Sequence, residues 1–191
     1  PDFAREVAQT MLVFHAGQGC AVQSRLLVPQ SRFEEAKAIL AHAYGAFGDN
    51  WGDFENPAHI MGPVVSARQQ ERVLDYVRIG LAEGATLVAG GKARPDKGSG
   101  FFVEPTCFAG DNTMRVAREE IFGPVLVLIP FADDDDAVRI ANDSDYGLGG
   151  GVVSADFERA MAIARRVRTG TMSVNGGMSI AGDIPFGGYK A

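Results

Sequence analysis

The sequence predicts an α/β protein in which a mostly parallel sheet lies between flanking helices, as three layers. Strand-like and helix-like segments alternate along the chain. Residues 125–129, Val-Leu-Val-Leu-Ile, form an unbroken apolar run that is typical of a central strand covered on both faces. With 191 residues, of which 46% are hydrophobic, the chain can bury a sizeable core. We therefore expect residues 1–191 to form a single domain.

The first part of the chain is predicted as helix, strand and helix. Apolar residues recur at helical spacing over residues 3–14, which predicts the first helix. Residues 25–28 are predicted as a short strand that Pro29 ends. The pattern Ser-Arg-Phe-Glu at residues 31–34 is a capping box, so the second helix is expected to begin there. The apolar positions of this second helix are Phe33, Ala36, Leu40, Ala43 and Phe47.

A loop, a third helix and a strand follow. Residues 48–63 are rich in Gly, Asn, Asp and Pro, which predicts a loop. Residues 66–69, Ser-Ala-Arg-Gln, are a second capping box, and the helix that they open is expected to end at Gly84. Residues 86–89 are predicted as a strand, and residues 90–100 as an exposed, hairpin-like loop. The side chains that the third helix is expected to bury are Val73, Val77 and Leu81.

The remaining segments again alternate strand and helix. Residues 101–108 are strand-like but interrupted by Pro105, and the central strand follows them. The acidic run over residues 133–136 suits the N-cap and first turn of a helix, where the helix dipole favours carboxylates, better than a metal site. Further along, strands are predicted at 149–153 and 171–174, with a helix at 156–168 between them. Gly170 is expected to close this helix, whose last turn would contain Arg165, Arg166 and Arg168.

Composition argues against several classes of function. The net charge of −6 does not favour nucleic-acid binding, which requires a basic patch. The sequence contains neither a signal peptide nor an apolar run of about 18 residues, so no membrane partner is expected. Two cysteines, Cys20 and Cys107, cannot build a disulfide scaffold, which favours a reducing, cytoplasmic setting. The three histidines are scattered and belong to no Cys/His cluster, so no metal site is expected.

Cys20 is the candidate nucleophile. It follows a Gly-Gln-Gly turn at the end of an apolar, helix-periodic run. A thiol reacts as its thiolate, which nearby amide dipoles or cations favour. The two glycines let the backbone approach a ligand closely and leave N–H groups free to face an oxyanion. The alternative interpretation is that a Cys among Ala and Val is a small buried hydrophobic residue.

Two further motifs could line a site. Residues 119–124, Glu-Glu-Ile-Phe-Gly-Pro, directly precede the central strand. They could supply a carboxylate for sugar hydroxyls and an aromatic ring that shelters a flat ligand, or they could be a loop with exposed acids whose Phe122 fills the core. Asn175 and residues 185–190 could form a pocket wall or a turn-rich surface loop.

Together these motifs resemble the aldehyde dehydrogenase superfamily. Residues 17–20, Gly-Gln-Gly-Cys, are similar to its catalytic-cysteine motif, and residues 119–124 and 185–190 are similar to two further motifs of the family. The resemblance covers essentially the whole chain and implies the fold of the family's catalytic domain. It also implies an NAD- or NADP-dependent enzyme that oxidises an aldehyde to a carboxylic acid through a cysteine hemithioacetal and a thioester.

The resemblance implies a role for each matching residue. Cys20 would be the nucleophile, Glu120 would bind the nicotinamide ribose, and Phe122 would contact the nicotinamide end of the cofactor. Gln69 falls where some members contact the cofactor, but its place in the capping box accounts for it here. Gly19 stands where glycine is unusual and would widen the site toward bulkier aldehydes. The aldehyde funnel would be lined by Gly19, Ala21, Ile180 and Phe186.

The resemblance further implies parts that these residues do not supply: a cofactor-binding domain, a general-base glutamate, an oxyanion-hole asparagine and an assembly strand. We therefore expect residues 1–191 to be an inactive fragment of a longer cytoplasmic protein, which forms a dimer or tetramer when full length. One alternative is a relative that passes the acyl group to coenzyme A or reduces an acyl phosphate. Others are a non-catalytic assembly domain and a stable fragment with no function of its own.

Overall fold

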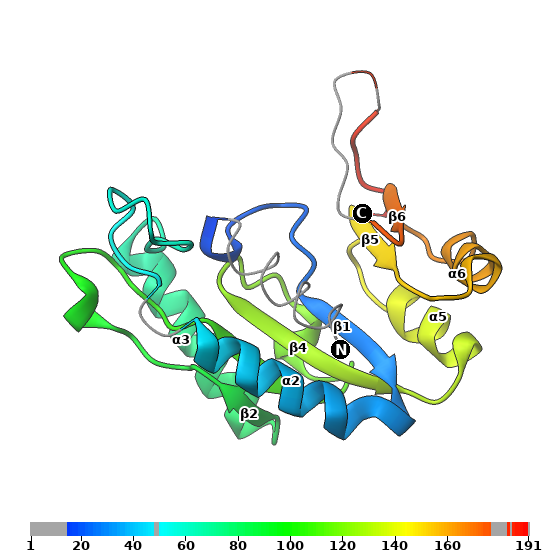
Figure 1. The fold of residues 1–191 in the computed structure, drawn as a ribbon, viewed down its shortest axis with the longest axis horizontal. Coiled ribbons are helices and arrows are strands. Elements are labelled where there is room, and N and C mark those ends of the chain that lie inside the picture. Colours follow the sequence, from blue (N-terminus) through cyan, green and yellow to red (C-terminus); the bar gives the residue numbers. More distant parts are fainter. Residues whose placement is uncertain (1–14, 48–49, 177–182, 184, 191) are drawn as a thin grey trace. The chain divides into compact units, whose positions relative to one another are not determined.

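A computed structural model describes residues 15–47, 50–176, 183 and 185–190 (Figure 1). The helix expected over residues 3–14 lies outside the described residues. The chain divides into two compact units, residues 1–130 and residues 131–191, and each is described by itself. The expectation of one domain over residues 1–191 stays a prediction.

The first unit is built on a four-stranded sheet. Its strands are β1 (Arg25–Pro29), β2 (Thr86–Ala89), β3 (Thr106–Ala109) and β4 (Val125–Phe131), in the order β1-β4-β3-β2. β4 runs parallel to β3, whereas β2 runs antiparallel to β3. Residues 125–129 are all buried, which confirms that this apolar run is a central strand.

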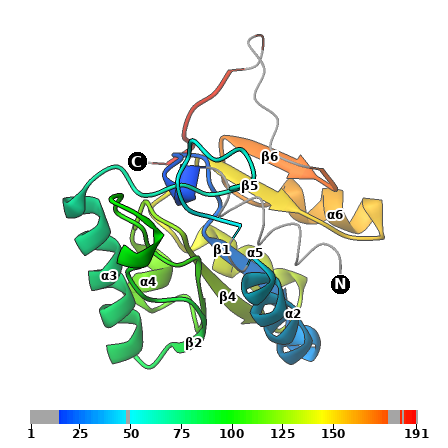
Figure 2. The ribbon, with the colours of Figure 1, turned by 60° about the vertical axis from the view of Figure 1, so that its left-hand side comes forward.

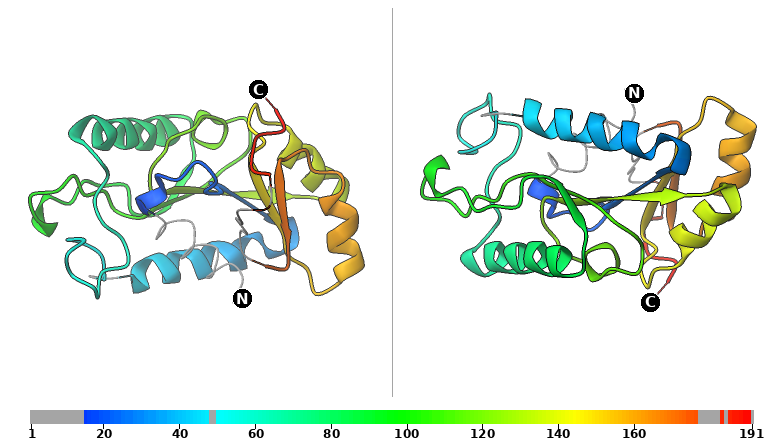
Figure 3. Two further views of the ribbon diagram at one scale, coloured as in Figure 1. Left: turned by 90° about the horizontal axis from the view of Figure 1, so that it is seen from above. Right: turned by 90° about the horizontal axis from the view of Figure 1, so that it is seen from below.

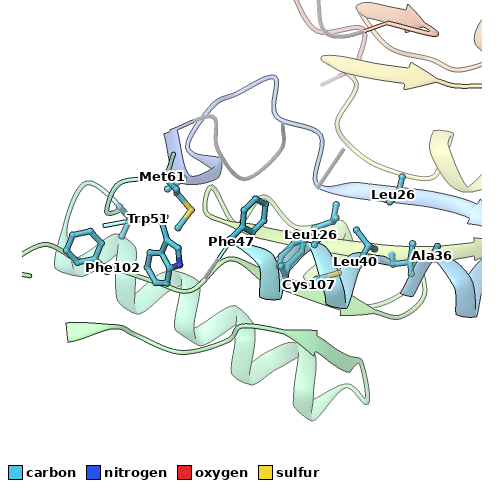
Figure 4. Packing of buried hydrophobic residues seen from close by; sticks show 14 residues of the cluster. Leu26, Ala36, Leu40, Phe47, Trp51, Met61, Phe102, Cys107 and Leu126 are labelled. Atoms are coloured by element: carbon cyan, nitrogen blue, oxygen red, sulfur yellow. The ribbon is translucent and has the colours of Figure 1, made fainter. Parts of the chain in front are cut away.

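Helices cover both faces of this sheet. Figures 2 and 3 show α2 (Phe33–Ala46) on one face and α3 (Ala67–Ala82) on the other, so the three-layer arrangement is confirmed for this unit. Between α2 and the sheet, Leu40, Cys107 and Leu126 are completely buried in one apolar cluster (Figure 4). The expected apolar face of α2 is confirmed, because Ala36, Leu40, Ala43 and Phe47 are buried and Phe33 is half-buried against the cluster.

The two predicted capping boxes behave differently. Ser66 is the N-cap of α3, and its Oγ accepts a hydrogen bond from the Gln69 N–H at 3.2 Å. Ser31 is not a cap, so that prediction is wrong: it lies inside a 3-10 turn, η2 (Gln30–Arg32), and α2 begins only at Phe33. The extra turn places Arg32 at the N-cap position, with no side-chain cap, and the Arg32 guanidinium pairs with Glu35 at 2.6 Å instead.

The third helix also differs from expectation at one position. Val73 and Val77 are buried as predicted, but Leu81 is 49% exposed. Gly80 takes the inward position, and a Cβ there would lie 3.3 Å from the Phe108 ring. A glycine lets the helix approach Phe108 closely, so the buried stripe of α3 passes through Gly80 and leaves Leu81 outside.

Turns near β2 follow the sequence-based predictions. Gly84 follows the C-cap of α3 with a φ of +87°, as expected for a C′ glycine. The 90–100 loop contains a 3-10 turn, η3 (Pro95–Lys97), and an antiparallel bridge joins Ala93 to Val103, which confirms its hairpin-like course. The strand interrupted by Pro105 is likewise confirmed, because regular pairing begins only at Thr106.

The second unit contains α5 (Asp134–Asn142), β5 (Gly149–Val152), α6 (Phe157–Ala164) and β6 (Thr171–Val174). β5 and β6 pair in parallel, and α6 packs against both. Asp133 is the N-cap of α5, and its carboxylate accepts from the Asp136 N–H at 2.9 Å, so the helix-start interpretation of the acidic run is confirmed.

The last helix is shorter than expected. α6 ends at Ala164, so the prediction that Arg165, Arg166 and Arg168 form its last turn is wrong. Arg165 is the C-cap, and Arg166 instead pairs with Asp135 at the start of α5, at 2.7 Å. Gly170 therefore follows a connecting turn, and a Cβ on it would overlap the carbonyl of Gly187.

Two properties concern the described residues as a whole. None of their helices has the length and apolar character that crossing a bilayer demands. Within the same part of the chain, His, Cys, Asp and Glu side chains do not gather into any group of three that could hold a metal ion.

Candidate active site

Cys20 is exposed at the end of a turn. The residues before it, His15, Ala16 and Gly17, all have positive φ, which reverses the chain sharply. The Gln18 side chain closes the turn, because its Nε2 donates to the His15 carbonyl at 2.9 Å and its Oε1 accepts from the Val65 N–H at 2.9 Å. Cys20 is thus exposed, and a substrate could reach it there.

The other cysteine has a contrasting environment. Cys107 is completely buried in β3, and burial raises the pKa of its thiol to about 12. Its Sγ donates a long hydrogen bond, of 3.7 Å, to the Phe108 carbonyl. A thiol that stays protonated and lies out of reach of solvent is a poor nucleophile, so the exposed cysteine is the better candidate.

The folded chain brings the cysteine turn against the 119–124 motif. A Cβ on Gly17 would overlap the carbonyl of Gly123 and would also meet Pro124 N at 2.9 Å. Gly17 has a φ of +72°, so both its conformation and its surroundings require glycine. Gly123 in turn lies against Val73 of α3. The two motifs are therefore in direct backbone contact.

Two side chains of α3 hold the carbonyl groups of this motif. Gln69 Nε2 donates to the carbonyls of Ile121, at 3.1 Å, and Phe122, at 2.6 Å. Arg72 donates from Nε to the Ile121 carbonyl at 3.2 Å and from Nη2 to the Glu120 carbonyl at 2.5 Å. The expectation that the capping box accounts for Gln69 is thus incomplete: its backbone N–H meets Ser66, but its side chain binds this loop.

The two adjacent glutamates differ in their surroundings. Glu119 accepts from Arg115 Nε at 2.7 Å and from the Tyr76 hydroxyl at 2.7 Å. Arg115 and Tyr76 together hold the pKa of the Glu119 carboxyl at about 2. The Glu120 side chain is exposed instead, and its carboxylate can accept hydrogen bonds from a ligand. Phe122 is 38% exposed at a φ of +60°.

The remaining predicted site residues are distributed as follows. Gly19 is half-buried, and Ala21, at 8% exposed, packs inward. Ile180 lies outside the described residues. Phe186, which is 44% exposed, belongs to the second unit. In that unit, Asn175 binds the backbone of Ser154 through both ends of its amide, at 2.8 and 2.9 Å.

Sequence reasoning missed Arg72 and Tyr76. The one available signal was their position, because Gln69, Arg72 and Tyr76 recur at spacings of three and four residues and so share one face of α3. Nothing in the sequence says which loop that face meets.

Comparison with known proteins identifies the family of this chain. The profile of the Aldehyde dehydrogenase family matches residues 2–191. The chain belongs to the aldehyde dehydrogenase family. Among its relatives in this family, the geranial dehydrogenase of Castellaniella defragrans is 44% identical over 180 residues, which are 94% of this chain and 37% of that protein. The chain therefore spans little more than a third of that relative.

Solved structures of aldehyde dehydrogenases share the fold. The cysteine-to-alanine mutant of aldehyde dehydrogenase C from Pseudomonas syringae, in complex with NAD+ and octanal, superposes with a TM-score of 0.90 at 40% identity, over 99% of this chain and 39% of that one. An aldehyde dehydrogenase of Mycobacterium tuberculosis in complex with NAD+ gives 0.90 at 42% identity, over 98% of this chain and 38% of that one. The mostly parallel α/β architecture is thus that of the aldehyde dehydrogenases.

Proposed function

We propose that Cys20 is the nucleophile of an NAD(P)+-dependent aldehyde dehydrogenase that oxidises an aldehyde to a carboxylic acid. The observation that carries the proposal is the backbone contact between Gly17 and Gly123. It joins the turn with the exposed thiol to the loop that bears Glu120 and Phe122. A nucleophile and a cofactor-binding loop must lie side by side for the reacting carbon to meet both.

The exposed groups of the loop suit one end of a dinucleotide. The Glu120 carboxylate is an acceptor that can bind two ribose hydroxyls, and the partly exposed Phe122 ring offers an apolar face to a flat heterocycle. These two residues would hold the nicotinamide nucleoside. NAD(P)+, when bound, supplies the hydride acceptor.

Cys20 carries out the covalent steps. Its thiolate adds to the aldehyde carbonyl carbon and forms a hemithioacetal, while the Cys20 backbone N–H faces the oxyanion. Once the carbon has lost hydride, the acyl group remains on sulfur as a thioester. Addition of water to the thioester carbonyl releases the acid and returns the thiolate. Gln18 holds the turn in place through both ends of its amide during these steps.

The proposed enzyme is longer than this chain. Residues 1–191 would be its cysteine-bearing catalytic domain, because relatives such as geranial dehydrogenase extend well beyond the matched part. We place the general base, the second oxyanion donor and most of the dinucleotide site in the rest of that protein. We further propose that it works in the cytoplasm as a dimer or tetramer.

The test compares the two cysteines in the full-length protein. Cys20→Ala should reduce NADH formation from an aldehyde to background, whereas Cys107→Ala should keep the activity and lower only the stability. Brief iodoacetamide treatment followed by peptide mapping should modify Cys20 and leave Cys107 unmodified until urea is added. An active Cys20→Ala variant, or modification of Cys107 first, would overturn the assignment.

A further inference from the structure

We propose that Tyr76 and Glu119 are positioning residues that fix the 119–123 loop so that Glu120 and Phe122 face the cofactor. The proposal rests on the function proposed above. Neither residue needs to touch the cofactor: Tyr76 is 7% exposed within α3, and the Glu119 carboxylate faces two protein partners. They would act through the loop that follows them.

The contacts form one continuous chain of interactions. Arg115, which begins α4 (Arg115–Arg118), donates to both carboxylate oxygens of Glu119, at 2.7 and 3.0 Å. The Tyr76 hydroxyl donates to Glu119 Oε2 at 2.7 Å. The Arg72 guanidinium lies 5.1 Å from the centre of the Tyr76 ring and donates to the Glu120 carbonyl. Arg115 and Tyr76 therefore hold the loop at the Glu119 side chain, and Arg72, which lies against the Tyr76 ring, holds it at the Glu120 backbone.

The loop needs such support because its backbone conformation is unfavourable at Phe122. Phe122 adopts a φ of +60°, a region that residues with a Cβ enter only when their surroundings enforce it. The carbonyls of Glu120, Ile121 and Phe122 all accept from Gln69 or Arg72. None of these three peptide groups can rotate without breaking a hydrogen bond, so the network defines where the Glu120 and Phe122 side chains point.

A stabilising role alone would have a different consequence from a positioning role. If the network merely stabilised α3 against α4, its loss would lower the melting temperature and leave the kinetics of the folded enzyme unchanged. If it positions the loop, its loss weakens NAD+ binding while Cys20, on the separate turn, keeps its reactivity. The Michaelis constant for NAD+ and the rate of Cys20 alkylation therefore distinguish the two roles.

The decisive experiment uses Tyr76→Phe and Glu119→Gln in the full-length enzyme. Tyr76→Phe keeps the ring beneath Arg72 and removes only the hydroxyl, and Glu119→Gln keeps an acceptor but removes the charge opposite Arg115. Each should raise KM for NAD+ by about tenfold, because a small displacement of Glu120 and Phe122 weakens binding that depends on their geometry. Cys20 alkylation should be unchanged. Because both residues act through one network, the double variant should raise KM for NAD+ by no more than the single variant with the larger effect does.

Two controls separate the possible failures. Tyr146→Phe removes a hydroxyl from a tyrosine that is 50% exposed in the second unit, and it should leave KM unchanged. Glu120→Gln removes the proposed cofactor ligand itself and should raise KM for NAD+. If Glu120→Gln has no effect, the proposed function of the loop is wrong. If Glu120→Gln weakens NAD+ binding but Tyr76→Phe and Glu119→Gln do not, the positioning role alone is overturned.

Discussion

Gly17 lies directly against the backbone carbonyl of Gly123, with no room for a Cβ between them. This contact joins two motifs that lie far apart in the sequence: the turn that presents Cys20 and the loop that presents Glu120 and Phe122. Gly17 ends a short 3-10 turn (His15–Gly17) and Gly123 lies in a bend, so close backbone packing and side-chain hydrogen bonds set the relative placement of the two segments.

Gly17→Ala should therefore disturb both motifs at once. The new Cβ would overlap the Gly123 carbonyl and would also strain a residue whose φ is +72°. We expect a loss of about 2 kcal/mol or more in the free energy of unfolding, together with a slower alkylation of Cys20. Urea denaturation and timed iodoacetamide labelling measure the two effects.

Gly45→Ala is the matched control for that substitution. Gly45 lies in α2, and among the described residues nothing beyond its own stretch of helix lies within 4 Å of the position where its Cβ would sit. Replacing a helical glycine by alanine should stabilise the protein by about 0.5–1 kcal/mol and leave Cys20 labelling unchanged. Equal effects of the two substitutions would contradict the close approach of Gly17 to Gly123.

The two serines of the predicted capping boxes should differ in their contribution to stability. Ser66→Ala removes the N-cap hydrogen bond of α3 and should cost about 1 kcal/mol. Ser31→Ala removes no cap, because Ser31 lies within a 3-10 turn and α2 begins after it, so its effect should stay within about 0.5 kcal/mol. Chemical denaturation of the two variants side by side measures the difference. A loss at Ser31 that equals the loss at Ser66 would contradict the observed start of α2.

Leu40 and Leu81 should respond differently to truncation. Leu40 is a residue of α2 and is completely buried, so Leu40→Ala should cost about 2–5 kcal/mol through lost burial and the cavity left behind. Leu81 is 49% exposed, so Leu81→Ala should change the free energy of unfolding by about 0.5 kcal/mol or less. Thermal or urea unfolding provides the comparison, and a large loss at Leu81 would place that residue in the core after all.

Glu119 should make the stability of the protein sensitive to acid. Arg115 and Tyr76 lower the pKa of its carboxyl from the ordinary 4.5 to about 2. Because the folded-state pKa is the lower one, the stabilisation is complete above about pH 4.5 and is lost as the pH falls toward 2. Glu119→Gln should therefore lower the urea midpoint at pH 7, and its difference from the wild type should shrink between pH 5 and about pH 3.

Glu55→Gln is the control for the acid-sensitivity experiment. Glu55 is exposed in the loop that follows α2. Its substitution should give the same urea midpoint as the wild type at each pH. A difference between Glu119→Gln and the wild type that stays constant down to pH 3 would show that the charge of Glu119 contributes nothing to stability.

Local signals in the sequence were sufficient for most of the secondary structure. The apolar run over residues 125–129 predicted the buried central strand, and Ser66, Asp133 and Gly84 correctly marked helix ends. These signals succeed because capping, φ preference and hydrophobic periodicity involve only neighbours along the chain. The errors at Ser31 and Leu81 have the opposite origin. A 3-10 turn before α2 and the close approach of Gly80 to Phe108 depend on how segments pack together.

The sequence by itself determined the family. Three motifs in a fixed order, residues 17–20, 119–124 and 185–190, can each be recognised from a few adjacent residues. It also determined the candidates, Cys20, Glu120 and Phe122. Only the tertiary structure decided which cysteine is exposed and which is buried, and which of two adjacent glutamates is held by Arg115 and Tyr76 while the other is exposed. The reason is physical: burial, pKa and hydrogen bonding are set by groups that folding brings together from distant parts of the chain, and residues adjacent in sequence can have opposite surroundings.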